Sequence, residues 1–204
     1  MAQRVVSEEM RFYYERRARE YDDWWLGEGR FSTRYRPGWH EEVAALTATV
    51  RALAPVPTLE VACGTAYLSR HLRGELTAID QSRTMVEIAA RRLPGARVRR
   101  GEAVPLAFAD GEFDRVFTGH FYGHLGSGER EAFVAEARRV AGELVVVDSG
   151  LGRGAPAAEH QERVLDDGSC HRVYKRFFTG AGLATELGGG EVLHDGDWFV
   201  AVRA

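Results

Sequence analysis

Several residue types that mark large classes of protein are rare in this sequence. Only two of its 204 residues are cysteines, Cys63 and Cys170, and neither lies in a Cys-x-x-Cys pair. A disulfide framework or a cysteine-based metal site is therefore not expected. No apolar run approaches the ~20 residues of a membrane-spanning helix, and the charged N-terminus lacks the apolar core of a secretory leader. We expect a cytoplasmic protein with no membrane partner.

Lysine is almost missing as well, and the basic residues form no stripe. Lys175 is the only lysine, so 26 of the 27 basic residues are arginines; they are scattered among acids, and the net charge is −3. A nucleic-acid partner normally requires a basic face, so none is expected. His120 and His124 are four residues apart, but they directly follow a predicted strand rather than lying on a helix. We therefore expect no metal site.

From residue 58 onward the pattern alternates between short strands and helices. Strands are predicted at residues 58–62, 75–80, 97–101, 113–118 and 143–149, and helices at 66–73, 82–93 and 128–140. This alternation is typical of a doubly wound, mostly parallel sheet of the α/β class. Residues 171–178 then read as extended and 179–187 as a short helix. Residues 191–203 predict an antiparallel hairpin with Asp195-Gly196 at its turn.

Two helices are predicted before the sheet. One spans residues 7–21, where apolar residues recur at helical spacing, and the other ends before Pro55. Residues 150–170 show no clear periodicity, and either a mobile lid or a long loop fits them. We expect a single domain over residues 1–204, made of N-terminal helices (1–55), a core (56–149) and a loop with a closing hairpin (150–204).

Open parallel sheets bind ligands beyond the carboxyl ends of their strands, so these ends hold the candidate site residues. At the first end, residues 60–66 (EVACGTA) begin with the acid Glu60 and continue with mostly small residues. Small residues let a ligand approach the backbone, or they simply allow a tight turn. At the second end, Asp80 lies twenty positions after Glu60. This is near the spacing at which an acid accepts hydrogen bonds from ribose hydroxyls, although Asp80 could also serve only as a helix cap.

Two further strand ends carry polar groups. Glu102 and Ala103 follow strand 97–101, where a carboxylate and a backbone N–H could read the edge of an adenine. Residues 118–124 (TGHFYGH) combine glycines, aromatic rings and two histidines after strand 113–118. This composition suits the floor between a cofactor and a substrate.

Taken in order, three stretches resemble the motif set of the Rossmann-like (class I) S-adenosylmethionine-dependent methyltransferases: LEVACGTAYLSRHL (59–72), LTAIDQSRTMVEIAARR (76–92) and RRGEAVPLAFADGEFDRVFTGHFYGHL (99–125). YYERRAREYDDWW (13–25) also resembles the lid helix of many small-molecule members. The resemblance implies a seven-stranded sheet that ends in an antiparallel hairpin, with N-terminal lid helices. It further implies S-adenosyl-L-methionine as cofactor, bound by the core, and methyl transfer to an oxygen, nitrogen or carbon of a small molecule.

Carried over position by position, the resemblance places the following residues at the cofactor: Tyr14, Arg17, Tyr21, Glu60, Ala62, Gly64, Asp80, Gln81, Met85, Glu102, Ala103 and Gly119. Asp80 is expected to hold the ribose hydroxyls, and Arg17 to bind the cofactor's carboxylate. The family's first motif reads acid-x-Gly-x-Gly-x-Gly, whereas Ala62 and Ala66 replace the outer glycines here and leave the turn less room. The aromatic residues at 13–25 could instead serve only to dock a helix.

His120 and His124 are the candidate catalytic residues. If the acceptor is a phenol or a hydroxyl, its proton must leave as the methyl group arrives, and a histidine is suited to take it. His120 is favoured because it is nearer the strand end. The alternative is that both histidines only line the pocket, since a reactive nucleophile needs no base.

Two functions of other classes remain open. A nucleotide-dependent oxidoreductase on a similar sheet is disfavoured because the G-x-G-x-x-G fingerprint is missing and because a closing hairpin is predicted. The sequence also has no G-x-x-x-x-G-K-[ST] phosphate loop. A binding-only relative that keeps the fold would have the same sequence features. We expect a monomer or a homodimer that acts on a small-molecule substrate.

Overall fold

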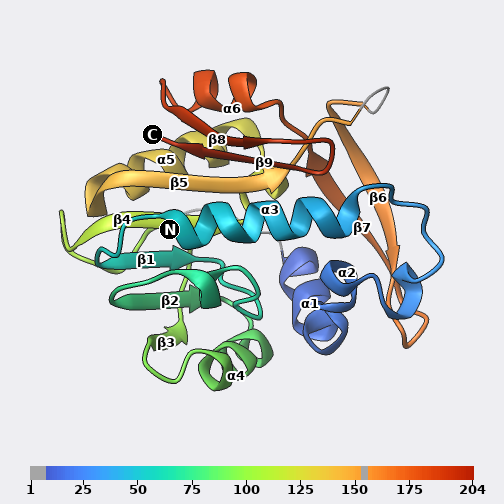
Figure 1. The fold of residues 1–204 in the computed structure, drawn as a ribbon. Helices are drawn as coiled ribbons and strands as arrows, with labels where there is room; N and C mark the ends of the chain where they lie inside the picture. The colour runs from blue at the N-terminus through green and yellow to red at the C-terminus, as the bar shows by residue number, and fades with distance from the viewer. Residues whose placement is uncertain (1–7, 153–155) are drawn as a thin grey trace.

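A seven-stranded sheet forms the centre of the computed structural model, which describes residues 8–152 and 156–204 (Figure 1). Its strands, in spatial order, are β3 (Arg97–Arg100), β2 (Leu76–Asp80), β1 (Thr58–Val61), β4 (Phe113–Gly119), β5 (Ala141–Ser149), β9 (Phe199–Arg203) and β8 (Glu191–Asp195). Strands β1 to β5 pair in parallel, whereas β9 runs antiparallel to β5 and forms a hairpin with β8. The predicted fold class, including the closing hairpin, is confirmed.

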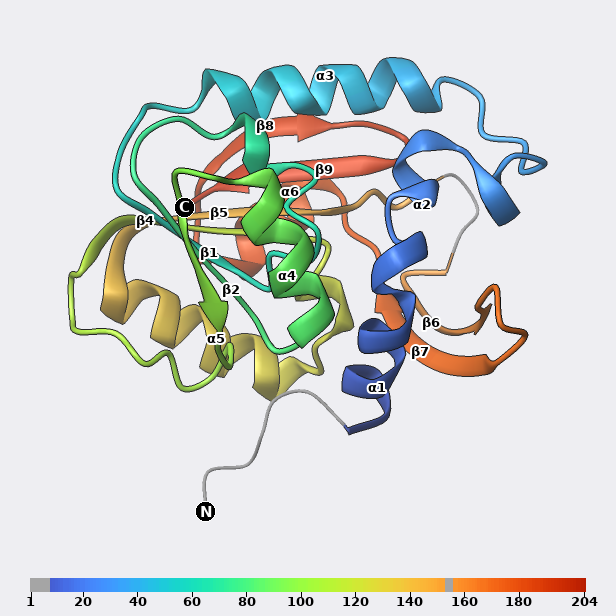
Figure 2. The same cartoon turned by 90° about the horizontal axis from the view of Figure 1, so that it is seen from below.

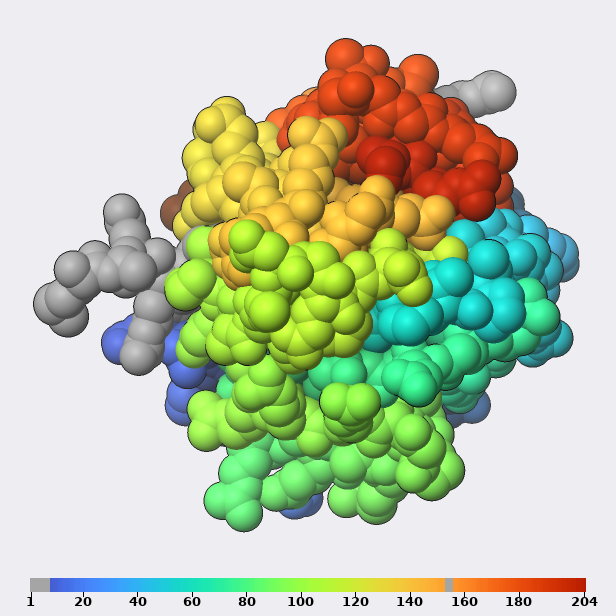
Figure 3. All heavy atoms as spheres, turned by 90° about the vertical axis from the view of Figure 1, so that its left-hand side faces the viewer, coloured from blue at the N-terminus to red at the C-terminus, as the bar shows by residue number. Residues whose placement is uncertain are grey.

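The strand order reverses between β1 and β4. The chain steps outward from β1 through β2 to β3, then returns to the other side of β1 and continues through β4 and β5. Adjacent strand ends diverge at such a switch point and leave a crevice for a ligand. In Figure 1 these ends point toward the N-terminal helices, drawn in blue, whereas Figure 3 views the opposite end of the sheet.

Helices cover both faces of the sheet, which explains why β1, β4 and β5 are buried along most of their length. On one face α5 (Ser127–Val140) and α6 (Gly180–Glu186) share an apolar core with β1, β4, β5 and β9. On the other face lie α3 (Trp39–Ala52) and α4 (Arg83–Arg92), each with its own cluster of buried side chains. Figure 2 shows α3 and α5 on opposite sides of the sheet.

The N-terminal segment lies across the carboxyl ends of the strands. It consists of α1 (Glu8–Arg17), a 3-10 turn (Ala18–Glu20), α2 (Asp23–Leu26) and a second 3-10 turn (Gly29–Phe31). The predicted helix 7–21 is thus shorter than expected, α2 was not predicted, and residue 7 lies outside the described residues. Tyr13 of α1 is buried against Leu165 and Val173.

A separate two-stranded sheet was missed by the sequence analysis. β6 (Ala158–Val164) pairs antiparallel with β7 (Cys170–Arg176), so residues 150–170 are not one long loop. The more buried side chains of β6 are Glu159, Gln161 and Arg163, which alternate with exposed ones. Because they are polar, the strand lacks the apolar alternation on which its prediction depends.

The predicted helix 66–73 is also wrong, because this segment contains only a 3-10 turn at Ser69–His71. Ala66 and Gly74 both adopt positive φ, of 60° and 96°, and so interrupt a right-handed helix on either side. The few residues between them are too short for a stable α-helix. None of the helices that the structure describes combines the length and apolar content that a bilayer crossing requires.

Candidate active site

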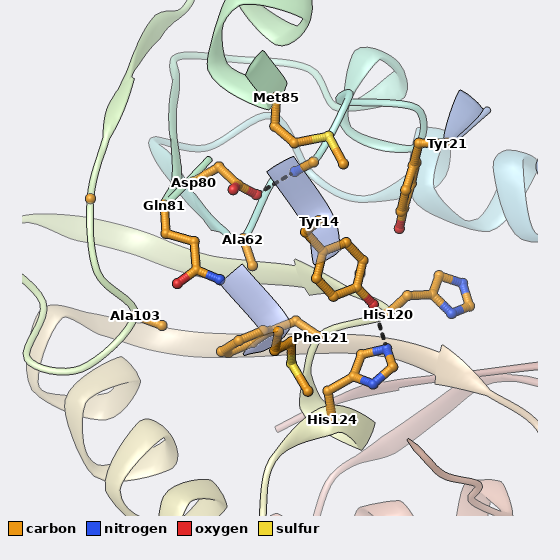
Figure 4. A pocket seen from close by; sticks show the side chains of 14 residues that line it. Tyr14, Tyr21, Ala62, Asp80, Gln81, Met85, Ala103, His120, Phe121 and His124 are labelled. Carbon is orange, nitrogen blue, oxygen red and sulfur yellow. Dashed lines mark hydrogen bonds between the residues drawn. The ribbon is translucent and has the colours of Figure 1, made fainter. Parts of the chain in front are cut away.

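Two adjoining cavities, which share lining residues, lie between the strand ends and the N-terminal segment. The first is lined by Met10, Tyr14, Tyr21, Ala62, Gly64, Asp80, Gln81, Met85, Gly101, Ala103, Gly119, His120, Phe121 and His124. The second, larger cavity is bounded by α1, α2 and the β6–β7 hairpin, and it shares Tyr14, Tyr21, His120 and His124 with the first. In Figure 4, Gln81 and Ala103 lie at one end of the first cavity and His120 at the other.

The turn after β1 brings the backbone into the first cavity. Ala62, Gly64 and Ala66 have φ of 57°, 54° and 60°, so the chain is left-handed at each of these small residues. A Cβ on Gly64 would lie 3.7 Å from the Tyr21 ring, which places this ring against the turn. A left-handed backbone costs residues other than glycine about 1–2 kcal/mol. The two alanines therefore keep the turn at a cost in stability.

Ala62→Gly is expected to stabilise the folded protein by about 0.5–1 kcal/mol, because relief of the left-handed strain exceeds the entropy that glycine adds to the unfolded chain. Ala62 is the better position because Ala66 is fully buried, and loss of its methyl group would offset the gain. The measurement is the free energy of unfolding without ligand. The matched control is Ala44→Gly on an exposed position of α3, which should lose about 1 kcal/mol. Equal losses in both variants would contradict the expectation.

Asp80 fixes the same turn from the end of β2. Its Oδ2 accepts a hydrogen bond from the Gly64 N–H at 2.9 Å (Figure 4). Its Oδ1 accepts one from the Ser82 N–H at 2.8 Å. Burial raises the pKa of Asp80 to about 6. Each carboxylate oxygen has a second lone pair, so Asp80 can still accept hydrogen bonds from a ligand in the cavity.

Glu60 lies outside the lining of the first cavity. Its side chain is 3% exposed, and Oε2 has no hydrogen-bond partner among the described residues. Burial, together with the charge of Asp80, raises the pKa of Glu60 to about 8. The raised pKa favours the neutral carboxylic acid near pH 7, and Glu60 is not among the residues that line the first cavity.

Tyr14 and His124 join α1 to the segment after β4. The Tyr14 hydroxyl lies 2.8 Å from His124 Nε2, and His124 Nδ1 lies 2.7 Å from the Tyr174 carbonyl oxygen (Figure 4). Burial, together with the charges of Lys175 and Arg163, lowers the pKa of His124 well below its usual value, so the ring is neutral. Because a carbonyl only accepts, Nδ1 carries the proton and Nε2 accepts from the Tyr14 hydroxyl. Both nitrogens of His124 are thus engaged.

His120 lies at the junction of the two cavities. Its backbone is left-handed, with φ of 57°, and its ring packs edge-on against Trp24, Trp25 and Phe199. Nδ1 lies 3.9 Å from Asp148 Oδ1, and Nε2 has no hydrogen-bond partner among the residues described. Burial lowers the pKa of His120 to about 3 although the charge of Asp148 raises it. The imidazole is therefore neutral at physiological pH.

The structure brings together most of the residues that the sequence placed at one site. Those that line the first cavity are Tyr14, Tyr21, Ala62, Gly64, Asp80, Gln81, Met85, Ala103, Gly119, His120 and His124. Three predicted residues do not line it. Glu60 is described above, Arg17 lines the second cavity, and Glu102 forms an ion pair with Arg11 at 3.4 Å.

Sequence reasoning missed three residues that line the first cavity: Met10, Gly101 and Phe121. Each lies within one helical turn of a predicted residue, or directly beside one, in the sequence. Met10 lies one helical turn before Tyr14, and the other two directly adjoin Glu102 and His120. Apolar and glycine residues carry no chemical signal of their own, so only these positions could have indicated them.

Comparison with known proteins agrees with this geometry. A family profile described as "Methyltransferase domain" matches residues 59–143. The demethylmenaquinone methyltransferase of Thermotoga maritima is 31% identical over 118 residues, which are 54% of this chain and 49% of that protein. The chain thus spans about half the length of this curated relative.

Two solved structures share the fold. The one described as "DhpI-SAM-HEP complex" is 26% identical, with a TM-score of 0.76, and the match covers 100% of both chains. The [4+2]-cyclase SpnF has a TM-score of 0.63 at 20% identity over 94% of this chain and 74% of that one, which is a likeness of fold alone.

Sheet topology, the position of the cavity and the profile match therefore agree on one family. The strand order with its closing hairpin, and the motif residues gathered at the switch point, are those that the sequence resemblance implied. Residues 59–143 match the methyltransferase domain, and the chain as a whole has the fold of the Rossmann-like (class I) S-adenosylmethionine-dependent methyltransferases.

Proposed function

We propose that this protein transfers a methyl group from S-adenosyl-L-methionine to a small-molecule acceptor. The observation that carries the proposal is the first cavity, in which Asp80, the left-handed turn and the segment after β4 meet at the switch point of the sheet. The DhpI structure named above is of a complex with SAM, and the curated relative is named a methyltransferase. Both support a cofactor of this kind here.

The residues present fit this cofactor. Gln81 Oε1 and His120 Nε2 are buried polar atoms of the cavity lining that lack hydrogen-bond partners among the described residues. Buried groups of this kind are normally satisfied by a ligand or water. Asp80 has spare lone pairs for two ribose hydroxyls, Gln81 and Met85 would flank the adenine, and the Tyr21 ring would face the sulfonium, which aromatic faces favour.

When bound, S-adenosyl-L-methionine supplies a methyl group that an acceptor atom can displace from sulfur. The protein holds the acceptor beside that methyl group and excludes water, and proximity alone can supply much of the acceleration. His120 lines both cavities, and its ring packs edge-on against Trp24, which lines the second cavity, and against the buried rings of Trp25 and Phe199. The predicted role of His120 or His124 as a base applies only to an acceptor that must lose a proton.

Calorimetric titration and product detection test this function. We expect S-adenosylmethionine and S-adenosylhomocysteine to bind and NAD not to bind. A panel of small molecules incubated with methyl-labelled cofactor should then give labelled product. Preferential binding of NAD would favour the oxidoreductase alternative. Cofactor binding without labelled product for any member of a broad panel would favour the binding-only alternative, because a fold does not by itself fix a function.

The first cavity is walled by α1, so we expect this helix to act as a cover. Polar contacts join four of its residues to other segments: Tyr14 with His124, Glu15 with Thr84, Arg16 with Asp167, and Arg11 with Glu102. Tyr13 also packs against Leu165 and Val173. Few apolar side chains of α1 are buried, so the helix can move aside when a cofactor enters. Hydrogen exchange in α1 should therefore slow when S-adenosylhomocysteine is added, whereas exchange in α5, which packs on the far face, should not change. Core-level protection of α1 without ligand would show that this helix is only structural.

A further inference from the structure

The second cavity has more basic side chains than Arg17 alone, the residue that the sequence resemblance assigned to the cofactor's carboxylate. Its basic lining residues are Arg17, Arg30, Arg34, Arg36, Arg163 and Lys175, and its acidic ones are Glu20, Glu162 and Asp197. The cavity is therefore more basic than the chain as a whole, whose net charge is −3. A basic pocket inside an acidic protein favours an anionic ligand.

Two of these cations lie next to the place where the cavities join. The guanidinium carbons of Arg17 and Arg163 lie 5.7 Å and 5.9 Å from the Tyr13 ring centre, so both reach the same aromatic side chain. Arg17 Nη1 donates to the Tyr13 hydroxyl at 2.8 Å, and Arg163 donates to Gln161 Oε1. Arg17 comes from α1 and Arg163 from β6, so two segments far apart in the sequence place a cation beside the same ring, and both charges act on His120.

Neither guanidinium is neutralised. Of the described residues, none places a carboxylate within ion-pairing distance of Arg17 or Arg163, although Arg17 is only 7% exposed. Glu20 and Asp23 are close enough to Arg17 for its charge to act on them, but they form no ion pair with it. Lys175, by contrast, is paired with buried Asp148. A buried charge normally has a partner, and here a ligand can supply it.

The histidines at the junction are poor proton acceptors. Both nitrogens of His124 are engaged, and His120 Nε2 lies on a ring whose positive form the burial and the three nearby cations disfavour. An acceptor that must lose a proton during methyl transfer would need a base at this point. An acceptor that is already an anion would not.

We propose that the methyl acceptor carries a carboxylate or phosphate-type oxyanion, that Arg17 and Arg163 bind this group in the second cavity, and that one of its oxygens receives the methyl group. This inference rests on the proposed function. An oxygen lone pair forms the new O–C bond while the C–S bond breaks and its electron pair remains on sulfur. The sulfonium and the oxyanion each lose one charge, the products are a thioether and a methyl ester, and no proton is released or taken up.

Binding to the protein saturated with S-adenosylhomocysteine tests the charge recognition. Benzoate is the probe for a carboxylate acceptor, and inorganic phosphate is the probe for a phosphate-type acceptor. Comparing the two affinities shows which kind of oxyanion the cavity prefers. At least one should bind, and Arg163→Gln should weaken it by at least about tenfold, as the loss of a charged hydrogen bond does. Arg172→Gln is the matched control, because Arg172 is an exposed residue of the same hairpin outside the cavity lining. It should leave binding unchanged.

The chemistry is tested with carbon-13 methyl-labelled S-adenosylmethionine. A panel pairs small carboxylic acids and phosphate monoesters with their amides, alcohols and amines, and nuclear magnetic resonance identifies the methylated atom. Methyl esters are expected from the acids alone. Failure of both anions to bind, equal binding by wild type and Arg163→Gln, or transfer to a neutral member would overturn the proposal. Loss of S-adenosylhomocysteine binding would be a failure of the proposed function instead, and Arg163→Gln should leave that binding unchanged.

Discussion

Asp80→Ala is expected to weaken S-adenosylmethionine binding by at least about tenfold and to lower the stability of the unliganded protein. The carboxylate would no longer accept bonds from the ribose, each worth roughly 1.5–3 kcal/mol. The structure adds a second effect, because the substitution also leaves the N–H groups of Gly64 and Ser82 without their acceptor. The affinity and the free energy of unfolding should therefore both change.

The pH dependence of binding is a further readout of the same group. Burial raises the pKa of Asp80 to about 6, above the ~3.9 of an unfolded chain. The neutral carboxyl of Asp80 thus contributes stability that is fully present below pH ~4. This contribution is lost as pH rises through about 6, where the buried carboxyl ionises. The charged form accepts the ribose hydroxyls more strongly, so cofactor affinity should rise over the same interval.

Calorimetry at several pH values and denaturant unfolding measure these effects. Asp114→Ala is the matched control, because Asp114 is an exposed aspartate on β4 and its removal should change neither quantity. Two results would contradict the assignment of Asp80 to the ribose. One is an Asp80→Ala affinity equal to that of the wild type, and the other is the same pH dependence of binding in Asp80→Ala and the wild type.

Lys175→Met is expected to destabilise the protein by about 3–5 kcal/mol, the usual cost of leaving one partner of a buried ion pair alone. Lys175 donates to Asp148 Oδ1, and the Asp148 side chain is fully buried. Asp148 also accepts from the N–H groups of Gly123 and Ser149, both at 2.7 Å. These bonds hold its charge in place, so Asp148 cannot turn toward solvent when Lys175 is removed.

A double-mutant cycle measures the interaction between Lys175 and Asp148 separately from the contacts that each makes with other residues. Adding Asp148→Asn to Lys175→Met removes the unpaired charge and should recover a substantial part of the lost stability. Arg172→Met removes an exposed cation from the same strand and should have little effect. If Lys175→Met were as stable as Arg172→Met, the pair would not be a buried interaction in solution.

The strand ends were predictable because chain topology alone brings them together. The motif residues at β1, β2 and β4 occupy fixed positions relative to parallel strands, so their order along the chain was sufficient to gather Gly64, Asp80 and Gly119. The α1 side of the cavity was predictable only through the resemblance of residues 13–25.

Contacts between distant segments were not predictable. Tyr14 and His124 are 110 residues apart and Lys175 and Asp148 are 27 apart, and nothing in the local pattern pairs them. The β6 strand was missed for a related reason. Its partly buried side chains are polar because they border a cavity rather than an apolar core, so the periodicity that identifies most strands is missing.

The position of the β6–β7 hairpin has a consequence for how proteins of this kind could diversify. It is inserted between β5 and α6, outside the profile match at 59–143, and it walls the second cavity without belonging to the main sheet. Evolution could therefore exchange this hairpin while the strands that would hold the cofactor stay unchanged. A chimera in which residues 156–177 come from a relative with a different acceptor should change acceptor preference and keep its affinity for S-adenosylhomocysteine.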